Sequence, residues 1–172
     1  GDRADRRRAD LERDEVDSRT RLALNACPVP VADASAQCGT LTVPEHRGRA
    51  DSRLIELPFV VLPARQAAKA DDPVLVLGGG PGSSVLLSLE TAAAGAAAPA
   101  LSAYDSRHSA RDLEELRLLL GALRGFRQWN IVATSYGTRL ALTALEDAGR
   151  TVRALVLDGP LPPERNALYS AG

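Results

Sequence analysis

The chain has 172 residues, which is enough for one hydrophobic core, so a single domain is the expectation. Its 21 basic and 22 acidic residues give a formal net charge of -1, which offers no electrostatic reason to expect nucleic acid or a membrane surface as a partner. Arginine and alanine are abundant and Lys69 is the only lysine, a bias that we attribute to genomic base composition rather than to phosphate recognition.

Residues 1–21 are dominated by charges of both signs, as in Asp5-Arg-Arg-Arg8 and Glu12-Arg-Asp-Glu15. A segment with almost no apolar side chains cannot form a core, so we expect a solvated helix or a disordered arm. Residues 22–172 are then the folded part of the chain.

Cys27 and Cys38 flank a short loop that contains two prolines. Zinc would need two more ligands nearby, and the only histidines are His46 and His108, so no metal site is predicted. A disulfide that closes the loop is the preferred interpretation, and a pair of buried free thiols is the alternative. A disulfide would indicate an oxidising compartment and would contribute about 3 kcal/mol in the chain-entropy model.

Two antiparallel strands are predicted next, Thr40 to Val43 and Leu54 to Leu62, joined by a polar turn. Pro58 in the second strand indicates a sheet edge or a bulge. A third strand, Pro73 to Leu77, runs into the loop Gly78-Gly-Gly-Pro81-Gly82. Such a loop can turn its backbone N–H groups towards a ligand oxygen. The spacing of a phosphate-binding loop is missing, and Pro81 stands where a dinucleotide-binding fingerprint needs a donor.

Further along the chain, a helix capped at Ser109 carries leucines at helical spacing and ends near Gly125. These are Leu113, Leu116, Leu120 and Leu123. A strand then ends at Ser135, a helix runs from Tyr136 to about Ala148, and a strand follows from Val152 to Leu157. Alternation of strand and helix predicts a parallel sheet with right-handed crossovers.

The segment Ala133-Thr-Ser135-Tyr-Gly137 places a serine between an apolar strand and a helix, with small residues two positions away on either side. This is the pattern of a nucleophile elbow, with alanine in place of the first glycine. Ser135 is therefore the candidate nucleophile. The backbone N–H groups of Tyr136 and Gly80 are the candidate oxyanion hole. The simpler alternative is that Ser135 only caps the helix.

Four motifs in this order resemble the proline iminopeptidase and tripeptidyl aminopeptidase branch of the α/β-hydrolases. They are the Gly-Gly-Pro-Gly loop, the Ser-Tyr-Gly-Thr elbow, the segment Leu155 to Pro163 and the opening strand Cys38 to Pro44. The resemblance implies a mostly parallel α/β-hydrolase sheet with flanking helices. It also implies a secreted or periplasmic serine hydrolase that acts on peptide N-termini or esters without a cofactor. No substrate-binding residue can be transferred from it.

Two parts of that family's pattern are missing. Between the Gly-rich loop and the Ser109 helix we expect a strand that ends in a turn resembling Asp-x-Arg-Gly-x-Gly, but residues 90–108 contain an alanine-rich run instead. A block is therefore deleted, or the chain joins segments that are not contiguous in a parent protein. The second missing part is the catalytic base, because no histidine follows Ser135. Asp158 stands where an acid sometimes lies, but a turn before Gly159 explains it more simply.

The sequence thus predicts the N-terminal half of a serine hydrolase, which supplies a nucleophile and an oxyanion hole. The acid and the histidine would lie in missing sequence or in a second chain, and this chain alone should be nearly inactive. A non-catalytic binding or assembly module on a hydrolase scaffold is the alternative. Neither nucleic acid nor a membrane span is expected.

Overall fold

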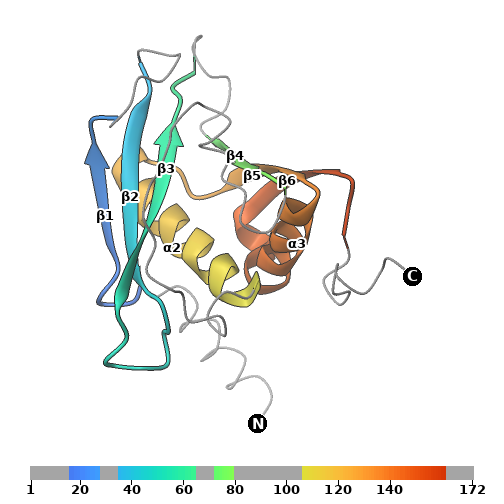
Figure 1. Cartoon of the computed structure of the whole chain (residues 1–172). Helices are drawn as coiled ribbons and strands as arrows, with labels where there is room; N and C mark the ends of the chain where they lie inside the picture. The colour runs from blue at the N-terminus through green and yellow to red at the C-terminus, as the bar shows by residue number, and fades with distance from the viewer. Residues whose placement is uncertain (1–15, 28–34, 65–71, 80–105, 162–172) are drawn as a thin grey trace.

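A computed structural model describes residues 16–27, 35–64, 72–79 and 106–161 (Figure 1). These residues form a mixed α/β structure with one antiparallel sheet, one parallel sheet and two helices. Residues 1–15 of the predicted arm lie outside the described ranges. The alanine-rich run, which stands where the family pattern has a further strand, also lies outside them. No helix among the described residues is long and apolar enough to cross a membrane.

The antiparallel sheet contains β1 (Arg21–Asn25), β2 (Gln37–Pro44) and β3 (Leu54–Val61) in that order. The middle strand pairs Leu41 with both Leu22 and Leu57, and Leu41 is only 2% exposed. Pro58 lies opposite Thr40 in β3, which is an edge strand of this sheet. The prediction of an edge position is confirmed, because an edge strand can hold a residue without an N–H where a central strand cannot.

The parallel sheet contains β4 (Val74–Leu77), β5 (Trp129–Thr134) and β6 (Val152–Asp158) in that order. The helix α3 (Tyr136–Ala148) and the short 3-10 helix η3 (Gly149–Thr151) connect β5 to β6. Side chains alternate along β5, so one face of the strand is buried in a core formed with α3. Its fully buried members are Trp129, Ile131, Ala133 and Ala141.

The long helix α2 (Ser106–Arg124) lies between the two sheets (Figure 1). Leu113 packs on the core of the parallel sheet, while Leu116 packs with Leu41 and Val43 of β2. One helix therefore covers two sheets and joins them.

Two details of this helix differ from the prediction. It begins at Ser106 rather than after a cap at Ser109, and the Oγ of Ser106 lies 3.4 Å from the hydroxyl of Tyr136. The first turn of the helix therefore makes a tertiary contact, and a local capping pattern does not encode such a contact. The leucine spacing predicts a buried Leu123, but its side chain is 61% exposed. It lies in the last turn of α2, beyond the leucines that pack on the two cores.

A network of charged and polar side chains joins α2 to the turn between β2 and β3. Glu115 is fully buried and accepts hydrogen bonds from Arg47 Nη1 at 2.7 Å, from Thr20 Oγ1 at 2.5 Å and from Asp17 N at 3.0 Å. Arg47 also pairs with Asp112, whose pKa is raised by burial although the guanidinium opposes this. The last residues of the predicted arm thus contact the folded part, because this network satisfies their polar groups.

Arg19 extends this network. Its side chain and backbone N–H donate hydrogen bonds to Asp17, which lower the pKa of that carboxyl to about 2. The same guanidinium donates to the backbone carbonyls of Arg47 and Arg49 in the turn between β2 and β3. These contacts hold the start of the described chain against the antiparallel sheet.

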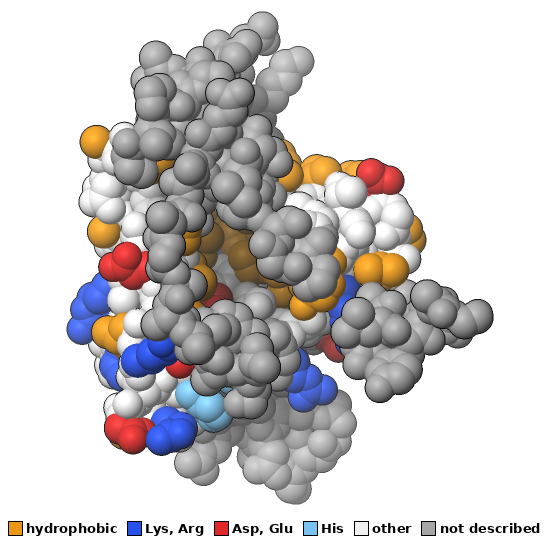
Figure 2. All heavy atoms as spheres, viewed as in Figure 1, with side chains coloured by type: hydrophobic (Ala, Val, Ile, Leu, Met, Phe, Trp, Pro, Cys, Tyr) orange, Lys and Arg blue, Asp and Glu red, His pale blue; other side chains and the backbone are white. Residues whose placement is uncertain are grey.

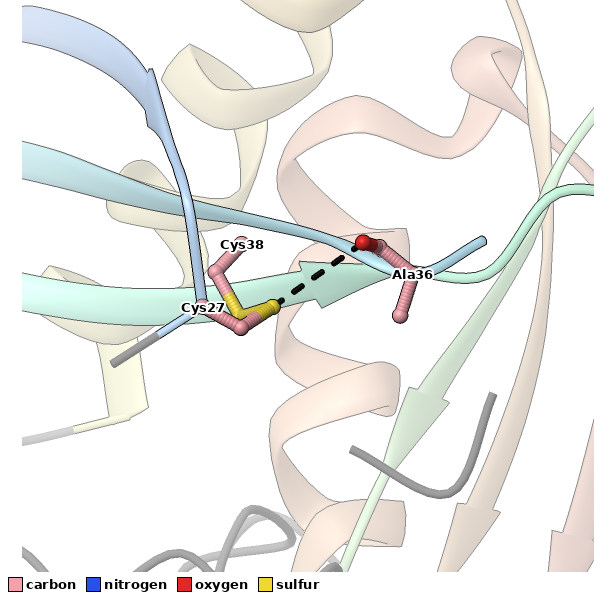
Figure 3. Close-up of a disulfide and its surroundings, with 3 residues drawn as sticks. All are labelled: Cys27, Ala36 and Cys38. Atoms are coloured by element: carbon pink, nitrogen blue, oxygen red, sulfur yellow. Dashed lines mark hydrogen bonds between the residues drawn. A yellow bond between two sulfur atoms is a disulfide. The ribbon is translucent and has the colours of Figure 1, made fainter. Parts of the chain in front are cut away.

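Cys27 and Cys38 form a disulfide (Figure 3). Cys38 lies in β2, and Cys27 follows the end of β1 by two residues, with a Cα–Cα distance of 4.9 Å. Pairing of the two strands brings the cysteines together, since Asn25 is the register partner of Cys38. The bridge closes a loop whose middle residues, 28–34, lie outside the described ranges.

Candidate functional site

Ser135 occupies the turn between β5 and α3, and its backbone has φ 53° and ψ -119°. It is the only residue other than glycine with a positive φ among those that the structure describes. L-amino acids rarely adopt this conformation, which costs about 1–3 kcal/mol. Such strain is found mainly at sites where it has a function.

The structure contradicts the alternative that Ser135 only caps α3. A capping serine has an extended backbone, and its hydroxyl accepts a hydrogen bond from an N–H two or three residues later. Ser135 has neither property, because its φ is positive and its side chain makes no capping hydrogen bond. The residue is exposed, so its hydroxyl is accessible at the carboxyl end of the parallel sheet.

Hydrogen bonds on both sides of Ser135 hold its backbone. Its N–H donates to the carbonyl of Asp158 at the end of β6, at 2.9 Å. Its carbonyl accepts from the N–H of Thr138 at 3.0 Å and from the hydroxyl of Thr138 at 2.5 Å. The strained conformation is therefore fixed by the neighbouring strand and by the first turn of α3.

Glycine is required close to this serine at two positions. A Cβ on Gly137 would lie 2.6 Å from the carbonyl oxygens of both Leu77 and Gly78. A Cβ on Gly79 would lie 2.8 Å from the Cβ of Ser135 and 3.4 Å from its Oγ. Separations near 2.6–2.8 Å are shorter than van der Waals contact, so both residues must lack a side chain. The start of the Gly-rich loop and the elbow are thus in direct contact.

The first small residue of the elbow, Ala133, is fully buried and packs with Ala141 of α3. Its methyl group therefore fits at the position where the pattern usually has glycine. Ala144 is also buried, as expected for a helix that lies close to the sheet.

The structure describes only one of the two candidate donors of the oxyanion hole. Tyr136 is the first residue of α3, and the amide of a first helical residue has no acceptor within its own helix. The positive end of the helix dipole also lies at this point and favours a developing negative charge. Gly80 lies outside the described residues, so its role stays a prediction that rests on the position of Gly79.

The two histidines lie together at the boundary between the β2–β3 turn and α2. The rings of His46 and His108 form an edge-to-face pair with centroids 5.8 Å apart. His46 N donates to Ser52 Oγ at 2.8 Å, and His46 Nδ1 is buried without a hydrogen-bond partner among the described residues. Figure 2 shows histidine next to basic and acidic side chains at the lower end of this view. The ring pair is a contact between this turn and α2.

Asp158 ends β6, and the next residue, Gly159, has φ 62°. A left-handed glycine directly after the strand confirms the interpretation of this segment as a turn. The observed contact of Asp158 with the site is through its backbone carbonyl, which accepts the N–H of Ser135.

Thr138 is the residue at this site that the sequence did not reveal. It is fully buried, and its hydroxyl connects the carbonyl of Ser135 with the N–H of Leu161. The available signal was its position three residues after the serine, since a threonine at that spacing can reach back to the start of the helix.

Within the described ranges, no group of three or more His, Cys, Asp or Glu side chains is arranged to hold a metal ion. No protein-family model matches the chain, and no curated protein matches it. The functional argument therefore depends on the geometry of the elbow. The site combines an accessible serine hydroxyl with a helix N-terminus and a glycine-rich strand end. This arrangement suits nucleophilic attack on a carbonyl carbon and stabilisation of the resulting oxyanion.

Proposed function

We propose that this chain supplies the nucleophile and the oxyanion hole of a serine hydrolase of the α/β-hydrolase type, related to the proline iminopeptidase and tripeptidyl aminopeptidase branch. The observation that carries the proposal is the backbone of Ser135, strained at φ 53° in a strand-to-helix turn. Folding alone does not require a strained residue here, whereas presentation of an exposed nucleophile does. The substrates would be peptides, attacked near the N-terminus, or esters.

In the proposed reaction, Ser135 Oγ attacks the substrate carbonyl carbon while its proton passes to a base. The carbonyl oxygen becomes an oxyanion, which the N–H groups of Tyr136 and Gly80 stabilise. The tetrahedral intermediate then expels the amine or alcohol, which takes up the proton, and leaves an acyl group on Ser135. Water attacks this ester in the same way, which releases the acid and restores the hydroxyl.

The base of this reaction would come from outside these 172 residues, because no histidine among them follows Ser135. The acid and the histidine of the hydrolase would lie either in sequence after residue 172 or in a second polypeptide that carries the C-terminal half. The disulfide between Cys27 and Cys38 supports an extracytoplasmic location, where such bonds persist.

The second candidate is a binding or assembly module that has kept the hydrolase scaffold without catalysis. Valines on one face of the parallel sheet favour it, because Val74, Val76 and Val156 are 57–58% exposed. The strained serine argues against it, since a scaffold without chemistry would have no use for that conformation.

Imidazole in solution can test the proposal with this chain as it exists. The protein is incubated with p-nitrophenyl acetate with and without imidazole, and acetylation is followed by intact mass and by peptide mass mapping. We expect one acetyl group on Ser135, formed faster with imidazole because imidazole replaces the missing base. Ser135→Ala should abolish this acetylation, whereas Ser109→Ala, a change of a helical serine, should keep the wild-type rate.

Two outcomes would contradict the proposal. One is the absence of acetylation at Ser135 in folded protein at any imidazole concentration. The other is acetylation of several serines at equal rates, because it would mean that the elbow gives Ser135 no special reactivity. Either result would favour the binding or assembly module.

A further inference from the structure

We infer that Thr138 is a positioning residue, whose hydroxyl holds Ser135 in the conformation required for attack. This inference rests on the proposed function, because it concerns the geometry of the same nucleophile. Thr138 would not touch the substrate. It would act through the backbone of Ser135.

The hydroxyl of Thr138 donates one hydrogen bond and accepts another. Its Oγ1 donates to the carbonyl of Ser135 at 2.5 Å and accepts from the N–H of Leu161 at 2.9 Å. The hydroxyl proton is committed to Ser135, since Leu161 N can only donate. The orientation of the hydroxyl is therefore fixed from both sides.

Burial makes these hydrogen bonds more important. Thr138 is 0% exposed, so water cannot replace a partner that is lost. The carbonyl of Ser135 accepts both the N–H and the hydroxyl of Thr138, and these two bonds occupy both of its lone pairs. Rotation of the Ser135 peptide would break both bonds together, which opposes relaxation from the positive φ.

The same hydroxyl also joins two segments that are far apart in sequence. Ser135 follows β5, while Leu161 follows β6 by three residues. The N–H of Ser135 in turn donates to Asp158 at the end of β6. The elbow is thus connected to the exit of β6 at two points. One of these points is backbone only, and the other depends on the Thr138 side chain.

Another buried threonine on the same helix provides a matched control. Thr143 is 6% exposed, and its Oγ1 donates at 2.9 Å to the carbonyl of Arg139, four residues earlier in α3. Its hydroxyl bonds back along the helix as that of Thr138 does, but it has no described contact with the elbow. A comparison of the two threonines separates support of the helix from positioning of the nucleophile.

The experiment compares Thr138→Val, Thr138→Ser and Thr143→Val by the imidazole-assisted acetylation of Ser135. Valine keeps the shape of threonine and removes the hydroxyl, so we expect the rate for Thr138→Val to fall about tenfold through misplacement of the nucleophile. Thr138→Ser keeps the hydroxyl and should rescue most of the rate. Thr143→Val should react as the wild type does, even if it loses a similar amount of thermal stability.

A second measurement does not depend on activity. The one-bond Cα–Hα coupling of Ser135, measured by NMR, distinguishes a positive from a negative φ. We expect Thr138→Val to shift this coupling away from the wild-type value, and Thr138→Ser and Thr143→Val to preserve it. If Thr138→Val does not fold, Leu161→Pro removes the N–H donor to Thr138 without changing α3. We then expect a smaller fall in rate and a coupling shift in the same direction.

The outcomes separate this inference from the proposed function. If wild-type Ser135 is not acetylated, the proposed function fails, and the NMR coupling still decides the role of Thr138. If the wild type reacts and folded Thr138→Val keeps its rate and coupling, the positioning role is overturned while the proposed function stands. A rate that Thr143→Val lowers equally would also overturn it, because the effect would then belong to the helix in general.

Discussion

At the scale of single residues, the site is defined by backbone conformation rather than by charge. Ser135 has a conformation that most residues avoid, and Gly137 lies where no side chain fits. Both features belong to one turn, in which a single residue separates β5 from α3 and the start of α3 packs against the end of β4.

Gly137→Ala is expected to destabilise the protein by about 1–3 kcal/mol, the usual cost of overpacking. The added Cβ would lie 2.6 Å from two backbone carbonyl oxygens, which cannot move as a flexible side chain would. Urea denaturation measures the effect. Gly149→Ala is the matched control, since its Cβ would meet Leu145 Cδ1 at an ordinary 3.8 Å. Equal stability of Gly137→Ala and the wild type would mean that α3 does not approach β4 so closely.

At the scale of secondary structure, α2 packs on both sheets and is also held by charged side chains to the turn between β2 and β3. Its leucines contact both hydrophobic cores, yet it also buries the ion pair Glu114–Arg117 and the carboxylate of Glu115. Apolar packing buries the faces of the two sheets but does not fix the orientation of the helix. The hydrogen bonds of Glu115 select one arrangement of helix and turn, because each donor has a fixed position.

Glu115→Gln is expected to lower the free energy of unfolding by about 3 kcal/mol, the lower end of the range for removal of one partner from a buried ion pair. The lower end applies because Asp112 remains beside Arg47. Chemical denaturation measures the change. The control is Asp51→Asn, which removes an exposed ion pair with Arg49 and should have no measurable effect. A similar small effect of both variants would show that Glu115 is not important for docking of the helix.

At the scale of the whole molecule, the described residues form two sheets of three strands, joined through α2 (Figure 1). The site lies at the carboxyl end of the parallel sheet, and the disulfide lies in the antiparallel sheet. The disulfide and the elbow therefore belong to different sheets. The disulfide should affect stability more than the reactivity of Ser135.

Removal of the disulfide by the double change Cys27→Ala and Cys38→Ala should cost about 2–4 kcal/mol, through the greater freedom of the unfolded chain. Reduction of the wild type should lower its free energy of unfolding by about the same amount, and a reductant should not affect the variant. Thiol labelling of denatured, unreduced wild type should find no free cysteine. Two labelled thiols would show that the bridge does not form.

The sequence predicted most of the local structure correctly. Its strand and helix periodicities predicted all of the described strands except β1, as well as both long helices. The spacing of small residues around Ser135 identified the turn that the structure shows to be strained. The errors occur where contacts between residues that are far apart in the sequence determine the structure. The helix α2 starts earlier than its cap pattern indicates, where Ser106 approaches Tyr136, and Leu123 follows the predicted stripe but is exposed.

The sequence by itself determined most of the strands, both long helices, which cysteines can pair and which serine stands in an elbow. These properties depend on residues that are close along the chain. Only the tertiary structure decided that Thr138 holds Ser135, that Glu115 receives donors from distant segments and that the two histidines pack together. The physical reason is that a hydrogen bond or ring contact depends on distance in space, which local periodicity does not encode.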